Sequence, residues 1–142
     1  MPERIKIMIG LAGLLLITLA WFRFPAAEEA VAPAWPALTS EGGDVSVEVS
    51  PVFSSDVWRF DIALNTHSVE LDEDIAASAA LIADGRTVRP LAWTGDPPGG
   101  HHRTGSLEFA PLSPPPDSVE LVLYGVGGAP ERSFRWELNA QK

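Results

Sequence analysis

Two segments decide the fold: residues 44–50 (DVSVEVS) and residues 57–65 (VWRFDIALN). Both alternate apolar and polar side chains with a period of two, which is typical of β-strands that bury one face. The first segment places its valines on one face, and the inward set expected for the second is Trp58, Phe60, Ile62 and Leu64. Residues 54–56 (SSD) have turn composition. The two segments therefore predict an antiparallel pair of strands joined by a short loop.

Five further segments have strand character: residues 75–84, 86–93, 106–110, 119–124 and 133–138. Residues 75–84 (IAASAALIAD) suit either a short helix or a strand, and the tight-hairpin signal Asp84-Gly85 favours the strand. Seven short strands separated by Gly, Pro and Asp predict an all-β fold. It should be an immunoglobulin- or fibronectin-like antiparallel β-sandwich, with a barrel as the alternative. The aromatic residues expected in the core are Trp58, Trp93, Phe109, Tyr124, Phe134 and Trp136.

Residues 1–24 predict one N-terminal transmembrane helix. Residues 7–22 (IMIGLAGLLLITLAWF) carry no charge, and with their flanks they span roughly 27 Å, close to the bilayer core of about 30 Å. Lys6 and Arg23 flank the apolar run, and Trp21 lies at its far end, as in membrane anchors. A cleaved signal peptide is the alternative, but Trp21 and Arg23 lie where cleavage requires small residues. We therefore expect a single-pass anchor.

The anchor is followed by a Pro/Ala-rich spacer, residues 25–40, and by an extracytoplasmic domain, residues 41–142. Trp35, in the spacer, either docks on the domain or lies near the lipid headgroups. Arg4 and Lys6 precede the span, whereas the positive charge of Arg23 after the span is offset by acidic residues that follow it. The positive-inside rule then predicts a cytoplasmic N-terminus in an inner or plasma membrane. The C-terminal domain should be periplasmic or extracellular.

The charge and composition exclude several classes of partner and chemistry. The formal net charge is −9, and no basic stripe offsets it, so nucleic-acid binding is not expected. The chain has no cysteine, which excludes disulfides, thiolate catalysis and cysteine-ligated zinc. The chain also has no G-x-S-x-G elbow, P-loop or dinucleotide fingerprint. We therefore expect no enzymatic activity.

All three histidines lie in two segments longer than ordinary turns, residues 65–74 and 95–105. Imidazoles and carboxylates are ligands for copper and zinc. The predicted metal set is His67, His101, His102 and Asp72, with Asp74 or Asp96 as further carboxylates. Adjacent strand residues point to opposite faces, so both histidines of the pair reach one ion only if the preceding Gly-Gly loop is irregular.

Two other hypotheses explain the same loops. In the structural one, His67 caps or ties its own loop, and Ser68 and Asp72 close side-chain-to-backbone hydrogen bonds there. His101 or His102 bonds a carboxylate and fastens one long loop to the other, and Arg103 pairs with Glu70 or Asp72. In the other, the loops form a docking surface for a partner protein. The side chains predicted to contribute to that surface are Ser68, Glu70, Asp74, Asp96 and Arg103.

Four motifs within residues 44–138 carry a resemblance to a known group of proteins. They are THSVELDED (66–74), PLAW (90–93), GGHHRTGSLEF (99–109) and FRWEL (134–138). The pattern resembles an uncharacterised family of bacterial membrane-anchored extracytoplasmic β-sandwich domains. The resemblance implies the sandwich fold and a role for His67, His101 and His102, but it implies no activity.

The function expected from these observations is a non-catalytic, membrane-anchored accessory or interaction module. It should pack on the outer face of a larger membrane-protein complex, with the bilayer and other membrane-protein subunits as partners and no cofactor. The alternative is an extracytoplasmic copper- or zinc-binding or sensing domain that uses the three histidines.

Overall fold

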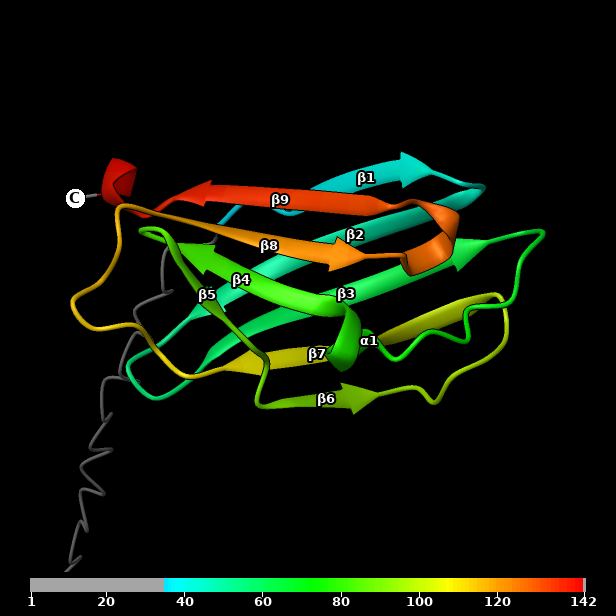
Figure 1. The fold of residues 1–142 in the computed structure, drawn as a ribbon, viewed down its shortest axis with the longest axis horizontal. Coiled ribbons are helices and arrows are strands. Elements are labelled where there is room, and N and C mark those ends of the chain that lie inside the picture. The colour runs from blue at the N-terminus through cyan, green and yellow to red at the C-terminus, as the bar shows by residue number, and fades with distance from the viewer. Residues whose placement is uncertain (1–34, 142) are drawn as a thin grey trace, which may run out of the picture. The chain divides into compact units, whose positions relative to one another are not determined.

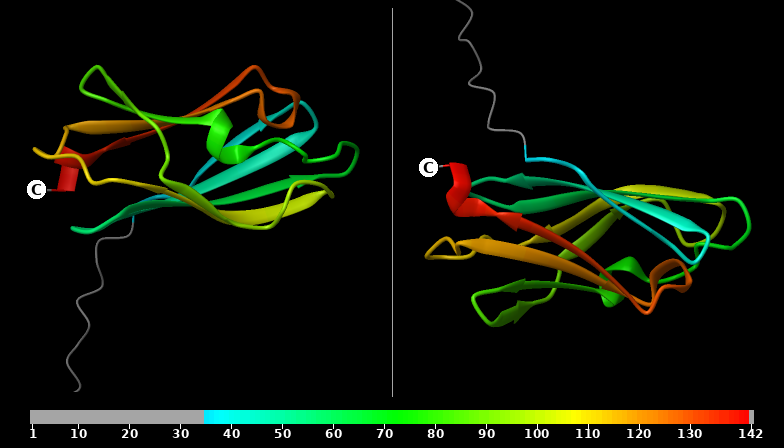
Figure 2. Two further views of the ribbon diagram at one scale, coloured as in Figure 1. Left: turned by 60° about the horizontal axis from the view of Figure 1, so that its bottom comes forward. Right: turned by 90° about the horizontal axis from the view of Figure 1, so that it is seen from above.

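The computed structural model describes residues 35–141, and these form two antiparallel β-sheets packed face to face (Figures 1 and 2). One sheet has five strands in the order β1-β2-β3-β7-β6, and the other has four in the order β5-β4-β8-β9. The strands are β1 (Leu38–Gly42), β2 (Val45–Phe53), β3 (Trp58–Thr66), β4 (Ala79–Ala83), β5 (Arg86–Val88), β6 (Ala92–Gly95), β7 (His102–Phe109), β8 (Ser118–Tyr124) and β9 (Glu131–Glu137). The short helices are α1 (Ile75–Ser78), η1 (Val126–Gly128) and η2 (Leu138–Gln141). The predicted all-β fold with two facing sheets is confirmed.

The pair of strands that decided the fold prediction is present as β2 and β3. The register places Val47 opposite Leu64 and Phe53 opposite Trp58. Every inward residue predicted for these strands is buried, with at most 5% of its surface exposed. Strand alternation was therefore sufficient to assign the buried face.

Aromatic rings fill the core at one end of the sandwich. Phe60 lies at the centre of this cluster, with its ring centroid 5.6 Å from those of Phe109 and Trp136 and 5.7 Å from that of Phe53. The prediction that Tyr124 is a core residue is wrong. Its neighbour Leu123 points inward, so Tyr124 lies on the outer face of β8 and is 44% exposed.

The structure describes nine strands where the sequence predicted seven. One addition is β1. The other arises because the segment predicted as a single strand, residues 86–93, breaks at Pro90 into β5 and β6, which lie in different sheets. Proline has no N–H to continue a ladder, so the chain leaves one sheet there and enters the other.

The segment predicted as a strand over residues 75–84 has two parts, which corrects that prediction. Its first four residues form α1, for which Asp74 is the N-cap and accepts a hydrogen bond from the Ala77 N–H at 3.0 Å. The remainder forms β4, which leads into the Asp84-Gly85 turn. Both residues of that turn have positive φ, as the two-residue hairpin requires.

The predicted anchor, including Lys6, Trp21 and Arg23, lies outside the described residues. Among residues 35–141 no helix is long and apolar enough to cross a membrane. Strand β1 begins at Leu38, within the range predicted as spacer. Trp35 packs against Phe53 with ring centroids 5.4 Å apart, which confirms that it docks on the domain.

Candidate functional site

The two histidine-bearing loops lie at the same end of the sandwich (Figure 1). The first follows β3 and the second precedes β7, and the register pairs Asn65 with His102 at this end. The β1–β2 turn and η1 join them there. We call this group the loop end: residues 43–44, 67–74, 96–101 and 126–128. Trp35 packs on Phe53, at the far end of β2, so the chain enters the sandwich at the opposite end.

Arg103 fastens the two long loops together from inside the sandwich. It is only 1% exposed. Its Nη1 donates to the carbonyls of Leu71 at 2.9 Å and Glu73 at 2.8 Å, and its Nη2 lies 3.4 Å from the carbonyl of Asp96. The guanidinium also lies 5.8 Å from the centroid of the Trp93 ring. The predicted pairing of Arg103 with the Glu70 or Asp72 carboxylate is therefore replaced by bonds to main-chain carbonyls.

Main-chain hydrogen bonds reinforce this connection. Leu71 donates its N–H to the carbonyl of Gly100 at 3.0 Å, and Gly99 donates to the carbonyl of Leu71 at 2.8 Å. The Gly100 N–H donates to the Glu70 carboxylate at 2.7 Å. Gly99 and Gly100 have φ values of 112° and 75°, so the Gly-Gly segment is irregular and uses the freedom of glycine. The two loops are therefore paired with each other along their main chains.

A second buried arginine, Arg132, holds the rest of the loop end. It is 2% exposed and donates to four carbonyls. These belong to Gly42 at 2.6 Å, Val126 at 2.9 Å, Ser40 at 3.0 Å and Gly127 at 3.3 Å. Burial lowers the pKa of its guanidinium, while the charges of nearby glutamates oppose that shift. Arg132 thereby ties the end of β1, in one sheet, to η1, which connects β8 and β9 of the other.

Glu73 connects the two arginine-centred groups. Its main-chain carbonyl accepts from Arg103, and its Oε1 accepts the Gly127 N–H at 2.7 Å. Sequence reasoning singled out neither Glu73 nor Arg132. A signal existed for Arg132, because it alternates with Phe134 and Trp136 at the spacing of an inward-facing strand set.

The three histidines do not converge. His67 is exposed, His101 has its Nε2 3.8 Å from Glu70 Oε1, and His102 has its Nδ1 2.8 Å from Asn65 Oδ1. Within residues 35–141 no group of three or more histidine, aspartate or glutamate side chains is placed to hold a metal ion.

The other predicted site residues have local partners. The Ser68 N–H donates to Thr66 Oγ1 at 3.3 Å, and Asp74 caps α1. Asp96 Oδ2 accepts from the Thr104 N–H at 2.8 Å and from Thr104 Oγ1 at 3.1 Å. These two hydrogen bonds lower the pKa of Asp96, and the main-chain bond has the larger effect. Asp72 is exposed at the surface.

Exposed charge at the loop end is acidic. Arg103 and Arg132 are buried, whereas the exposed charged side chains of the loop-end residues are Asp44, Glu70, Asp72, Asp74 and Asp96. The exposed Arg89 donates to the carbonyl of Ala79, directly after α1. The exposed Arg59 and Arg86 lie beside the β2–β3 and β4–β5 turns, away from this end. The loop end therefore presents a rigidly tied, negatively charged surface.

Comparison of the chain with family models, curated proteins and solved structures finds no match.

Proposed function

We propose that this chain is a non-catalytic accessory or interaction module, anchored in an inner or plasma membrane by its N-terminal helix. The domain, an immunoglobulin- or fibronectin-like sandwich, lies on the periplasmic or extracellular side. There it presents the loop end to a subunit of a larger membrane-protein complex. The observation that carries this proposal is the fastening of two long loops by a fully buried arginine.

Fastened loops suit a docking surface because they lose little freedom on binding. Association costs free energy for each loop that must become ordered, and a pre-organised loop avoids that cost. Arg103 and the Leu71, Gly99 and Gly100 main-chain bonds hold the loops before any partner arrives. The surface residues between these ties, such as Asp72, are then held ready for contact.

The roles of the polar side chains also favour an interaction module over an enzyme. Asp74 caps a helix, Asp96 holds the main chain of β7, and His102 bonds Asn65. A general acid or base must instead be within reach of a substrate proton. These groups have structural partners that account for their positions.

The charge of the loop end specifies the chemistry of the partner surface. Its exposed charges are carboxylates, so complementarity favours a partner that presents lysine or arginine. Such contacts weaken with salt because screening reduces the attraction between exposed charges. Association should therefore be weaker at 0.5 M salt than at 0.1 M salt.

Purification of the full chain from membranes in mild detergent tests the proposal. Wild type should resist extraction by alkaline carbonate and should retain a stoichiometric partner subunit. Asp72→Lys reverses an exposed charge at the loop end and should release the partner, whereas Asp56→Lys, in the β2–β3 turn at the other end, should not. Equal retention by both variants would contradict docking at the loop end. Absence of any stoichiometric partner for wild type would contradict the accessory role.

The copper or zinc site stays a prediction. Metal analysis of the purified full chain, compared with the His101→Ala/His102→Ala double variant, tests it directly. Stoichiometric metal that is lost in the double variant would support the alternative function.

A further inference from the structure

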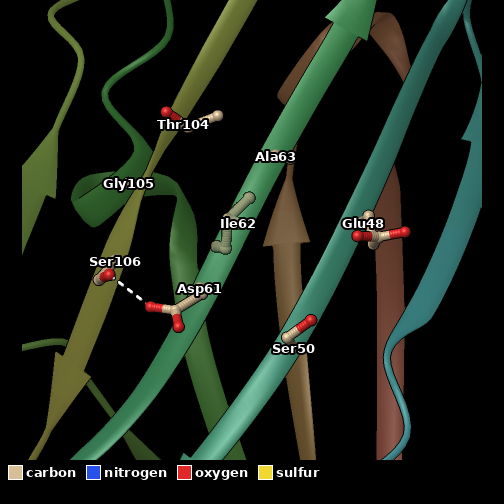
Figure 3. A pocket seen from close by; sticks show the side chains of 8 residues that line it. All are labelled: Glu48, Ser50, Asp61, Ile62, Ala63, Thr104, Gly105 and Ser106. Carbon is tan, nitrogen blue, oxygen red and sulfur yellow. Dashed lines mark hydrogen bonds between the residues drawn. The ribbon is translucent and has the colours of Figure 1, made fainter.

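A shallow groove of about 290 Å³ lies on the outer face of the five-stranded sheet (Figure 3). It crosses the middle of β2, β3 and β7. The side chains and main chain that line it belong to Glu48, Ser50, Asp61, Ile62, Ala63, Thr104, Gly105 and Ser106. No lysine or arginine is among them, so the lining combines carboxylates, hydroxyls and a small apolar floor.

Ala63 creates the groove. The register places it between Glu48 on β2 and Thr104 on β7, both of which carry longer side chains. Side chains of neighbouring strands stand side by side on a sheet face, so a methyl group between two larger neighbours leaves a hollow. The hollow has an apolar floor with polar groups on both sides.

The two carboxylates of the groove differ in their surroundings. Asp61 accepts from the Ser106 hydroxyl at 2.5 Å and pairs with Arg59, whose Nε lies 3.0 Å away. Glu48 is exposed, and within residues 35–141 no hydrogen bond or ion pair engages its carboxylate. The groove thus offers a negative charge beside an apolar floor.

We propose that the groove receives a lysine or arginine side chain of the partner subunit. The methylene groups of that side chain lie over Ala63, and its cationic end reaches Glu48. Long basic side chains combine an apolar stem with a charged head, which matches this lining. The inference rests on the proposed function, because it names a contact of the same module.

The position of the groove supports the same partner. His102 and Asn65 occupy the next row of this sheet face toward the loop end, and Thr104 is held by Asp96 of the loop end. A basic partner that covers the acidic loops can therefore continue along the sheet face onto Glu48. The loop end and the groove are then neighbouring acidic surfaces, with the polar pair His102–Asn65 between them.

The experiment uses amide chemical shifts of the ¹⁵N-labelled full chain in detergent micelles, with n-butylammonium as a probe for lysine and n-butylguanidinium for arginine. At least one probe should shift the amides of Ala63, Thr104 and Gly105 in a saturable manner, while butyrate should not. Glu48→Gln should weaken binding by about two- to fivefold, as expected for an exposed ion pair. Glu108→Gln, on the same sheet face outside the groove, is the matched control.

Ala63→Leu distinguishes binding in the hollow from simple attraction to the carboxylates, because it fills the hollow and keeps every carboxylate. Saturable shifts should disappear in this variant, while the rest of its spectrum remains that of the folded domain. Ala63→Val is the smaller replacement if the leucine variant does not fold. Shifts that persist unchanged in the filled variant, or that spread over all acidic surfaces, would overturn the proposal, as would an absence of saturable shifts in wild type.

The groove and the accessory role can fail separately. Probe binding without a stoichiometric partner would contradict the accessory role and leave a cation-binding groove. A stoichiometric partner without saturable probe binding in the groove would contradict only the groove.

Discussion

Replacement of Arg103 by methionine should destabilise the domain more than any surface substitution. Methionine keeps an unbranched apolar side chain in the space beside Trp93, but it removes the Arg103 bonds to the carbonyls of Leu71 and Glu73. The Leu71 carbonyl keeps the Gly99 N–H as a donor, whereas the Glu73 carbonyl loses the donor it has within residues 35–141. Each hydrogen bond from a charged donor contributes about 1.5–3 kcal/mol, and a buried carbonyl left without a donor costs the same order. The loss of the two short hydrogen bonds lowers the free energy of unfolding, while the absence of a buried cation removes a desolvation cost and offsets part of that change. The net decrease in the free energy of unfolding should be about 3–5 kcal/mol.

Urea unfolding of the full chain, followed by tryptophan fluorescence, measures this loss. Arg86→Met is the matched control, because Arg86 is exposed and surface substitutions usually change stability by less than about 0.5 kcal/mol. Hydrogen exchange at the amides of Leu71, Gly99 and Gly100 should accelerate in Arg103→Met before the sheets unfold. A loss below about 1 kcal/mol, with unchanged exchange in the loops, would show that Arg103 does not hold them.

Two further predictions concern single contacts of β7. A Cβ on Gly105 would lie 2.5 Å from the Trp93 ring, so Gly105→Ala should destabilise the domain by about 1–3 kcal/mol. Gly42→Ala is the control, because a Cβ there has no atom within 4 Å, and its free energy of unfolding should change little. Thermal unfolding of both variants checks this. Hydrogen bonds from Thr104 lower the pKa of Asp96 below its ordinary value of 3.8, so its contribution to stability is present above pH 3.8 and is lost as the pH falls through the lower folded-state pKa. A carboxyl NMR titration in which Asp96 has a pKa of 3.8 or higher would contradict this assignment.

Periodicity predicted most of the sheets because each strand buries one face. The segments around Val47, Phe60, Leu121 and Phe134 all alternate, and their inward residues are buried. Prediction failed where one residue changes the path of the chain, as at Pro90. It also failed at β1, an edge strand whose segment (LTSEG) has Leu38 as its one large apolar residue and therefore shows no alternation. Tyr124 was misassigned because aromatic type was given more weight than its position next to the inward-facing Leu123.

The candidate site was only partly predictable. The two long loops and the capacity of Gly99-Gly100 for an irregular main chain follow from composition and alternation, whereas the pairing of His102 with Asn65 of β3 does not. The hydrogen-bond partners of Arg103 could not be predicted from composition and alternation. A guanidinium donates to carboxylates and main-chain carbonyls alike, and the sequence does not say which of them will be nearby. Arg132 was overlooked although its alternation with Phe134 placed it inside.

Local patterns in the chain were thus enough for the class of fold, the buried faces of the main strands and the segments that form long loops, since period and turn chemistry act over a few residues. Which loops meet, which carbonyls the buried arginines bind and where a groove forms depended on the packing of strands distant in sequence. Arg132 and Gly42, for example, are 90 residues apart along the chain and 2.6 Å apart between donor and acceptor. Contacts of that kind arise only when the two sheets come together, because hydrophobic burial chooses the packing and the polar groups then find the partners that it brings within reach.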